Sequence, residues 1–212
     1  MSINLFRKDA LNRTNPIIRA LAVRTMSSLR VSKLTEYLIE PLKASLNDDD
    51  PYVRKTAVLS VPKIYEIAPN DAETNNLVST LEALITKEPN ALVLANAIAS
   101  LEEISMISGK QHIKMDSVLL GRILVAINEC MEWAQVFILD FLCKYTPQSE
   151  EEAEMIVDRI LPRLSHINPA VIFGCIKVVV RYFDYLSNEE LIKNLVKKLA
   201  SSIISVLSFA PV

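Results

Sequence analysis

The most regular feature of the sequence is a pattern of apolar and small residues with the spacing of a helix face. In the segment that opens at Asn15-Pro16, such residues recur at intervals of three, four, seven and eight positions. Residues at these intervals share one side of an α-helix, so the segment is predicted to form an amphipathic helix. The predicted buried face consists of Ile18, Leu21, Ala22, Thr25, Met26 and Leu29.

The same pattern returns four more times, which indicates an internal repeat. The second copy opens at Asp50-Pro51, the fifth at Asn168-Pro169, and consecutive copies are about 35 to 42 residues apart, near the period of HEAT and armadillo repeats. The four further predicted faces are Val53, Thr56, Ala57, Ser60, Val61 and Ile64; Val93, Asn96, Ala97, Ser100, Leu101 and Ile104; Ile138, Leu139, Leu142 and Cys143; and Val171, Gly174, Cys175, Val178, Val179 and Tyr182.

Helix-start residues support this division. Where Asn or Asp precedes Pro, its side chain can cap the start of a helix. Proline is tolerated in the first turn because the N–H groups there have no partner within the helix. Further helices are predicted between the copies, over residues 34–46, 74–85, 117–128, 150–164 and 188–207, and Pro41 and Pro162 are expected to bend two of them. The predicted fold is all-α, a right-handed α-solenoid of HEAT or armadillo type with about five helical pairs, in a single segment over residues 1–212.

The composition agrees with a helical chain and excludes several classes of function. Half of the 212 residues are hydrophobic and only 3 are glycine. The net charge of -2 gives no case for nucleic-acid binding. The three thiols, Cys130, Cys143 and Cys175, lie in apolar stretches and are expected to be reduced and buried. No run reaches about 18 uncharged apolar residues, so we expect any membrane contact to be peripheral.

The sequence gives no catalytic, cofactor-binding or metal-binding site, and the chain is predicted not to be an enzyme. His112 and His166 have no neighbouring constellation of reactive groups. The acidic run at residues 48–50 lacks the alternation and closing Glu of a calcium loop. We expect it instead to cap a helix and to pair with Arg54, or with Arg19 of the preceding repeat.

Two other features have both a structural and a functional interpretation. Seven cations lie in the first 33 residues, and they either form a solvated face with inter-repeat pairs or attract an anionic membrane or acidic partner. They are Arg7, Lys8, Arg13, Arg19, Arg24, Arg30 and Lys33. Asn96 lies on an apolar face, as in armadillo peptide binders, but without a ladder of such residues it is expected to bond a buried backbone group.

Four ordered segments resemble the β subunits of clathrin adaptor complexes, the β-adaptins. They are the stretch from Asn15-Pro16-Ile17-Ile18-Arg19 to Met26, the stretch from Asp50-Pro51-Tyr52-Val53-Arg54 to Ala57, the stretch Glu129–Asp140, in which Glu132-Trp133-Ala134-Gln135 is similar to the family's Glu-Trp-Gly-Gln, and the stretch Pro162-Arg163-Leu164-Ser165-His166. The resemblance implies part of the N-terminal trunk of a β-adaptin, a curved HEAT-type solenoid. Ala134 stands where the family usually has Gly.

The resemblance also implies a function and partners. The chain would be a scaffold subunit of a heterotetrameric vesicle-coat adaptor, acting in clathrin-dependent protein transport and endocytosis beside a second large, a medium and a small subunit. It would be cytoplasmic, on the cytosolic face of Golgi, endosome or plasma membrane. An Arf-family GTPase and an anionic membrane are further candidate partners, and clathrin would bind only through regions outside this chain. No cofactor and no nucleic acid are implied.

Two alternatives remain at this point, a large subunit of a non-clathrin coat and an armadillo-type peptide-binding module. The ends of the chain carry a further expectation. The stretch 199–209 has no charged residue, and a solenoid end of this kind is expected to expose an apolar patch and to self-associate when isolated.

Overall fold

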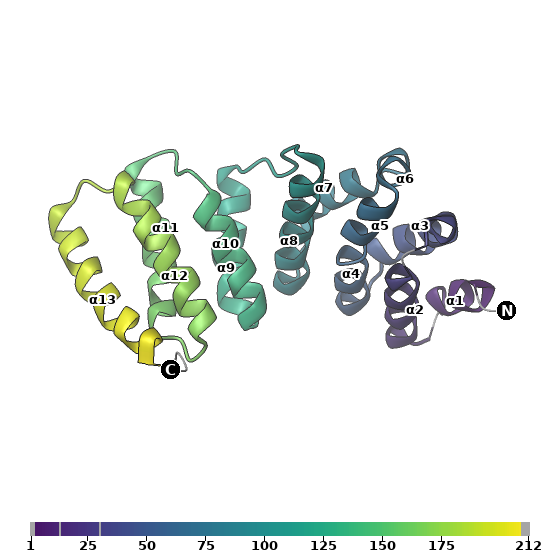
Figure 1. Ribbon diagram of the computed structural model, residues 1–212, viewed down its shortest axis with the longest axis horizontal. Helices are drawn as coiled ribbons and strands as arrows, with labels where there is room; N and C mark the ends of the chain where they lie inside the picture. Colours follow the sequence, from purple (N-terminus) through teal and green to yellow (C-terminus); the bar gives the residue numbers. More distant parts are fainter. Residues whose placement is uncertain (1–2, 13, 30, 209–212) are drawn as a thin grey trace. The chain divides into compact units, whose positions relative to one another are not determined.

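The computed structural model describes residues 3–12, 14–29 and 31–208. They contain helices and connecting loops, with no β-strand among the described residues. The helices are α1 (Ile3–Ala10), α2 (Pro16–Ser28), α3 (Ser32–Leu46), α4 (Pro51–Val58), α5 (Val61–Ile67), α6 (Pro69–Thr74), α7 (Leu77–Lys87), α8 (Ala91–Ser108), α9 (Ser117–Glu129), α10 (Glu132–Lys144), α11 (Glu150–Ile160), α12 (Pro169–Tyr182) and α13 (Glu189–Ser208) (Figure 1). Two 3₁₀ helices, η1 (Leu161–Ser165) and η2 (Phe183–Tyr185), follow α11 and α12.

The chain divides into two compact units, Met1–Leu120 and Gly121–Val212, which we call unit 1 and unit 2. In unit 1, the helices that open successive repeats are α2, α4 and α8, and α4 packs on both of the others. In unit 2, the opening helices α10 and α12 pack on each other, and α12 also packs on α11 and α13. Each unit is thus a stack of helical repeats, and the predicted all-α, solenoid-type fold is confirmed.

The predicted helix faces agree with the structure in four of the five copies, apart from a few positions. All six predicted residues of α8 and all six of α12 are buried. In α4 and α5 only Thr56 is not fully buried, and in α10 only Cys143. Ala57, a small residue of the second predicted face, has no exposed surface.

The predicted face of α2 is wrong in phase. Ala22 and Met26 are buried, but Ile18, Leu21 and Leu29 are exposed, while Ala20, Val23 and Ser27 point into the core. Small residues on the inward side let α2 approach α1, α3 and α4 closely. When Thr and Ala are counted as apolar, the sequence of α2 is compatible with two overlapping buried faces. In the structure, the buried face is the one with the smaller side chains.

Proline and local backbone geometry changed several predicted boundaries. The helix expected over residues 150–164 is α-helical only to Ile160 and continues as η1, because Pro162 cannot donate the next backbone hydrogen bond. The helix expected over 74–85 begins at Leu77, after Asn76 in a left-handed conformation with φ of 60°. Pro41 lies inside α3, and the short helix α1 was not predicted.

One helix, α8, has the length and mean hydropathy of a possible membrane span, among the described residues. It includes Glu102 and Glu103, which is why no uncharged run of that length was found in the sequence. Half of the window is buried, and α8 packs on α4, α5 and α7. These contacts are those of a core helix within unit 1.

Candidate functional site

Four of the opening helices, α2, α4, α8 and α12, begin at a side chain that caps them, whereas α10 follows Met131 and has no side-chain cap. Asn15, Asp50 and Asn168 accept a hydrogen bond from the backbone N–H two residues ahead, at 2.8–2.9 Å, and each precedes a proline. Asn90 caps α8 through two N–H groups, those of Leu92 and Val93, both at 3.1 Å. The predicted caps at Asn15, Asp50 and Asn168 are therefore confirmed. They fix where each helix starts and so set the register of the charged residues that follow.

The first charged contact between repeats in unit 1 joins Arg19 and Asp48. The guanidinium donates from Nε and Nη2 to the two carboxylate oxygens, each at 2.7 Å, and from Nη1 to the carbonyl of Asn12 at 2.8 Å. Asp48 also accepts the backbone N–H of Asp50 at 2.9 Å. The carboxylate therefore ties the arginine of one repeat to the helix cap of the next.

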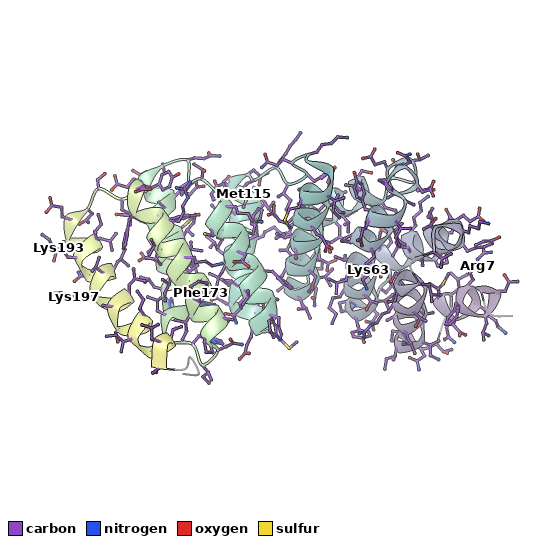
Figure 2. All side chains as sticks on the ribbon, viewed as in Figure 1. Arg7, Lys63, Met115, Phe173, Lys193 and Lys197 are labelled. Carbon is purple, nitrogen blue, oxygen red and sulfur yellow. The ribbon has the colours of Figure 1, made fainter. Side chains whose placement is uncertain are left out.

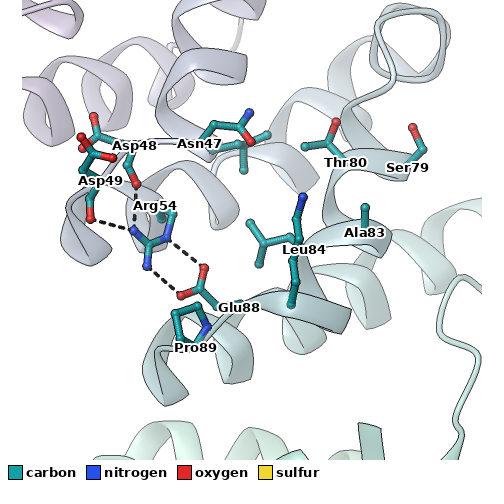
Figure 3. A pocket seen from close by; sticks show the side chains of 12 residues that line it. Asn47, Asp48, Asp49, Arg54, Ser79, Thr80, Ala83, Leu84, Glu88 and Pro89 are labelled. Carbon is teal, nitrogen blue, oxygen red and sulfur yellow. Dashed lines mark hydrogen bonds and ion pairs between the residues drawn. The ribbon is translucent and has the colours of Figure 1, made fainter. Parts of the chain in front are cut away.

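The second contact, between Arg54 and Glu88, has the same design (Figure 3). Nε and Nη2 of Arg54 donate to the two oxygens of Glu88 at 2.9 and 2.7 Å, while Nη1 donates to the carbonyls of Asp48 and Asp49. Glu88 accepts the N–H of Asn90, the cap of α8, at 3.0 Å. We call these two contacts the arginine ladder. The predicted pairing of the acidic loop with Arg19 is confirmed, whereas Arg54 takes a carboxylate from the next repeat.

Position in the repeat explains why the ladder recurs. In both cases the arginine lies four residues after the cap, and the acid lies two residues before the next cap. In unit 2 the equivalent acid position before Asn168 holds His166, whose Nδ1 accepts the Asn168 N–H at 3.0 Å. The arginine position is occupied by Gln135 in α10 and Ile172 in α12, so unit 2 has no equivalent ladder among its described residues.

Pairing also determines the protonation of these groups. Partial burial acts to raise the pKa of Asp48, but the hydrogen bonds from Arg19 and from the Asp50 N–H outweigh it and lower that pKa. The hydrogen bond with Glu88 raises the pKa of Arg54, and the one with Asp48 raises the pKa of Arg19. The contact between Arg19 and Asp48 therefore joins a guanidinium and a carboxylate at neutral pH.

A groove of about 720 Å³ lies beside the second contact, between the loop after α3 and helix α7 (Figure 3). Its walls include Asn47, Asp49, Ser79, Thr80 and Lys87. A smaller hollow of about 310 Å³ lies on the other side of the same loop, against α1 and α2. Both grooves are open and are lined by polar and apolar side chains in similar measure.

Unit 2 stacks its repeats without the ladder. Gly174 of α12 lies so close to Leu139 of α10 that an added Cβ would be 3.1 Å from the leucine Cδ1. The buried Tyr182 hydroxyl donates to the carbonyl of Leu142 at 3.0 Å. At the surface, the ammonium of Lys177 pairs with Asp140 at 2.5 Å. Close packing and single hydrogen bonds thus take the place of the paired charges.

A buried arginine joins the second helices of unit 2. Arg163 in η1 donates to the carbonyl of Ile127 at 3.0 Å and to the side chain of Asn128 at 2.5 Å. It therefore satisfies the C-terminal end of α9, where helix carbonyls have no partner within the helix. Burial lowers the pKa of Arg163. This residue has a structural role that the sequence did not indicate.

The reactive side chains considered in the sequence lie apart from one another. His112 contacts Glu82 through Nδ1 at 2.9 Å and Ser108 through Nε2 at 3.2 Å. Cys130 and Cys175 are buried, and burial raises their pKa values to about 11 and about 12, while Cys143 is half-buried. The described residues include no group of three or more His, Cys, Asp and Glu side chains that could hold a metal ion.

Asn96 and the basic cluster divide between structural and exposed positions. The Asn96 side chain is buried and donates to the carbonyl of Leu92 at 2.7 Å, as predicted. Of the seven cations, Arg19 belongs to the arginine ladder, whereas Arg7, Lys8, Arg24 and Lys33 are exposed (Figure 2 labels Arg7). Arg13 and Arg30 lie outside the described residues.

The chain is similar in sequence to known proteins. A family model described as non-SMC mitotic condensation complex subunit 1 (Cnd1) matches residues 17–181. The chain belongs to this helical-repeat family. Among its relatives are AP-1 complex subunit beta of Dictyostelium discoideum, 45% identical over 211 residues, and AP-1 complex subunit beta-1 of Mus musculus, 43% identical over 213 residues. AP-2 complex subunit beta of Schizosaccharomyces pombe is 32% identical over 195 residues.

The coverage of these relatives is uneven. The first two alignments span all of this chain but 22% of each relative, and the third spans 92% of this chain and 29% of the relative. The chain therefore covers less than a third of the length of these relatives. The resemblance to β-adaptins is confirmed, because the relatives are adaptor-complex β subunits and the similarity runs along the whole chain.

Proposed function

We propose that the chain is a scaffold segment of an adaptor-complex β subunit in vesicle-mediated protein transport. The observation that carries the proposal is its identity of 38–45% with AP-1 β subunits over its full length. The stacked helical repeats supply a suitable architecture, since a solenoid offers long surfaces to partner chains. In this role the chain acts through protein–protein contacts and not through catalysis.

The partners follow from the same proposal. The chain would assemble with a second large subunit, a medium subunit and a small subunit, on the cytosolic face of Golgi, endosomal or plasma membranes. Clathrin would be recruited by regions outside residues 1–212. An Arf-family GTPase and an anionic membrane are secondary candidates, supported by the exposed cations Arg7, Lys8, Arg24 and Lys33.

Two other functions have weaker support. The description of the matching family favours a subunit of a mitotic condensation complex. However, that match covers residues 17–181, whereas the adaptor relatives align along the whole chain. A peptide-binding armadillo module would need side chains such as Asn96 free to grip a peptide backbone, but the Asn96 amide is buried and bonded to its own helix.

Co-expression provides the test. The tagged chain is produced together with a second large, a medium and a small adaptor subunit, and the purified material is analysed by mass spectrometry and sedimentation. We expect all four chains in one complex. A folded chain, with its helical circular dichroism intact, that recovers none of the three would contradict the proposal. Preferential recovery of condensation-complex subunits from cell extract would favour the family-based alternative.

A further inference from the structure

The groove beside Arg54 in unit 1 has a free charge on each of its two walls. One wall is a face of α7, on which Thr80 and Lys87 lie seven residues, or about 10.5 Å, apart. The other wall is the loop after α3, which includes Asn47 and Asp49. The side chains of Asp49 and Lys87 are exposed, and neither makes a hydrogen bond or an ion pair with the described residues.

The ion pair between Arg54 and Glu88 connects the two walls (Figure 3). Nη1 of Arg54 donates to the backbone carbonyl of Asp49 at 2.9 Å, and Nη2 donates to the carboxylate of Glu88 at 2.7 Å. Lys87 is the residue before Glu88. The free acid and the free base therefore flank the same ion pair, one on each side of it.

The balance of charge in the groove favours a ligand that carries both signs. Five charged side chains line it, and three of them belong to the arginine ladder, in which each charge has a partner. The remaining two are one carboxylate, Asp49, and one ammonium, Lys87. A purely acidic ligand is repelled by Asp49 and a purely basic one by Lys87. Electrostatic complementarity therefore requires a cation beside Asp49 and an anion beside Lys87.

The volume and the free acceptors of the groove favour an extended segment of protein chain. Two turns of helix with their side chains would fill roughly 1,000 Å³, whereas the groove holds about 720 Å³. An extended segment brings backbone N–H groups that need acceptors. The Asn47 side chain donates to the carbonyl of Lys43, which leaves its oxygen free to accept. The Thr80 hydroxyl donates to the carbonyl of Asn76, and its oxygen can accept as well.

We propose that this groove binds an extended segment of a partner protein in which a basic and an acidic residue are adjacent. Successive side chains of an extended chain point to opposite sides. The basic side chain therefore reaches Asp49 while its acidic neighbour reaches Lys87, and backbone N–H groups of the segment bond the acceptors between them. The inference goes beyond the scaffold function, since it gives unit 1 a binding site that needs no other adaptor subunit.

Two peptides of identical composition test this geometry. Each has about six residues and blocked ends, with one lysine and one glutamate among serines and alanines. In the adjacent peptide the two charges are neighbours and face opposite walls, whereas in the spaced peptide one residue separates them, so both face the same side. Backbone amide NMR of the full chain follows the binding. We expect the adjacent peptide to shift residues 47–49 and 79–87 in a saturable manner, and the spaced peptide to bind about 3-fold more weakly or worse.

Substitutions at the walls test the two charges. Asp49→Asn and Lys87→Gln should each weaken the adjacent peptide about 3-fold or more. The double variant Asp49→Lys, Lys87→Glu exchanges the signs of the walls and should restore binding, because the peptide can turn over. Lys197→Gln, at an exposed lysine of unit 2, is the matched control and should change nothing (Figure 2 labels Lys197). Circular dichroism confirms that each variant is folded.

Three results would overturn the inference: no saturable shift with millimolar adjacent peptide, equal binding of the two peptides, or an equal loss in Lys197→Gln and Lys87→Gln. Tighter binding of a peptide with the lysine and glutamate four positions apart would also overturn it, because charges at that spacing share one face of a helix. The peptide titrations use the chain alone, without the other adaptor subunits. Their failure is therefore distinguishable from failure of the scaffold function, which the co-expression assay measures.

Discussion

Unit 1 joins its opening helices through paired charges, whereas unit 2 joins them through a glycine contact, single hydrogen bonds and one exposed ion pair. Arg19 and Arg54 each bind a carboxylate with two nitrogens and backbone carbonyls with a third. In α12 the corresponding position is Ile172, and the helix instead approaches α10 at Gly174. The same repeat thus tolerates two ways of fixing neighbouring helices.

This difference between the units predicts which substitutions destabilise each of them. Partly buried charges are costly when one partner is removed, because the other charge stays out of water. Close packing is sensitive to added volume instead. We therefore expect unit 1 to respond to loss of charge and to pH, and unit 2 to respond to added methyl groups.

The largest expected effect is the loss of Arg54. The side chain of Glu88 is only 3% exposed, so Arg54→Met would remove the bidentate partner of a buried carboxylate. We expect a loss of about 3 kcal/mol in the free energy of unfolding, measured by urea denaturation. Amide hydrogen exchange should increase most in α4 and α8.

Arg24→Met, at an exposed arginine, is the control and should change stability by less than about 0.5 kcal/mol. Equal effects of the two variants would refute the structural importance of the ladder.

Asp48→Asn should cost about 2 kcal/mol at pH 7, since it removes hydrogen bonds between charged groups. Because the pKa of Asp48 is lowered in the folded state, its contribution is fully present above the pKa of the unfolded chain, near 4. The contribution disappears as the pH falls through the folded pKa, so the stabilities of variant and parent should converge at low pH. Unfolding curves at several pH values check this, with Asp49→Asn as the exposed neighbour. A difference independent of pH would exclude ionisation of Asp48 as its cause.

Glycine substitutions sharpen the comparison for unit 2. Gly121 and Gly174 both lie in helices, where alanine is intrinsically favoured by about 1 kcal/mol. A Cβ at Gly121 meets nothing within 4 Å, so Gly121→Ala should stabilise the protein. At Gly174 the new Cβ would also be 3.2 Å from the Cβ of Leu139, so Gly174→Ala should destabilise it by about 1 kcal/mol. Thermal denaturation of both variants checks the prediction, and equal stabilisation would show that α10 and α12 are loosely packed.

The smallest expected effect is that of the ion pair in unit 2. Asp140 and Lys177 have side chains 47% and 38% exposed, and such pairs contribute about 0.5 kcal/mol or less. Asp140→Asn should therefore leave the unfolding free energy nearly unchanged, in contrast to Asp48→Asn. Parallel urea titrations of the two variants make the comparison. A loss above about 2 kcal/mol in Asp140→Asn would erase the distinction between the units.

The sequence by itself determined the fold class, most helices and the caps of α2, α4 and α12. These features are local: the spacing of apolar residues and an Asn or Asp before a proline act within one or two turns. The pairing of Arg19 with the acidic loop could also be predicted, because repeats place equivalent residues side by side. The resemblance to β-adaptins likewise depended only on ordered residues along the chain.

Tertiary structure alone decided the inward side of α2, the carboxylate that Arg54 binds and the role of Arg163. Arg54 and Glu88 are 34 residues apart, and no local rule chooses Glu88 over the nearer aspartates. Likewise, nothing in a helical pattern shows that Trp133 and Phe173 stay exposed while their neighbours are buried. These features depend on which helices pack together and how closely, and packing is a property of pairs of elements that no single segment contains.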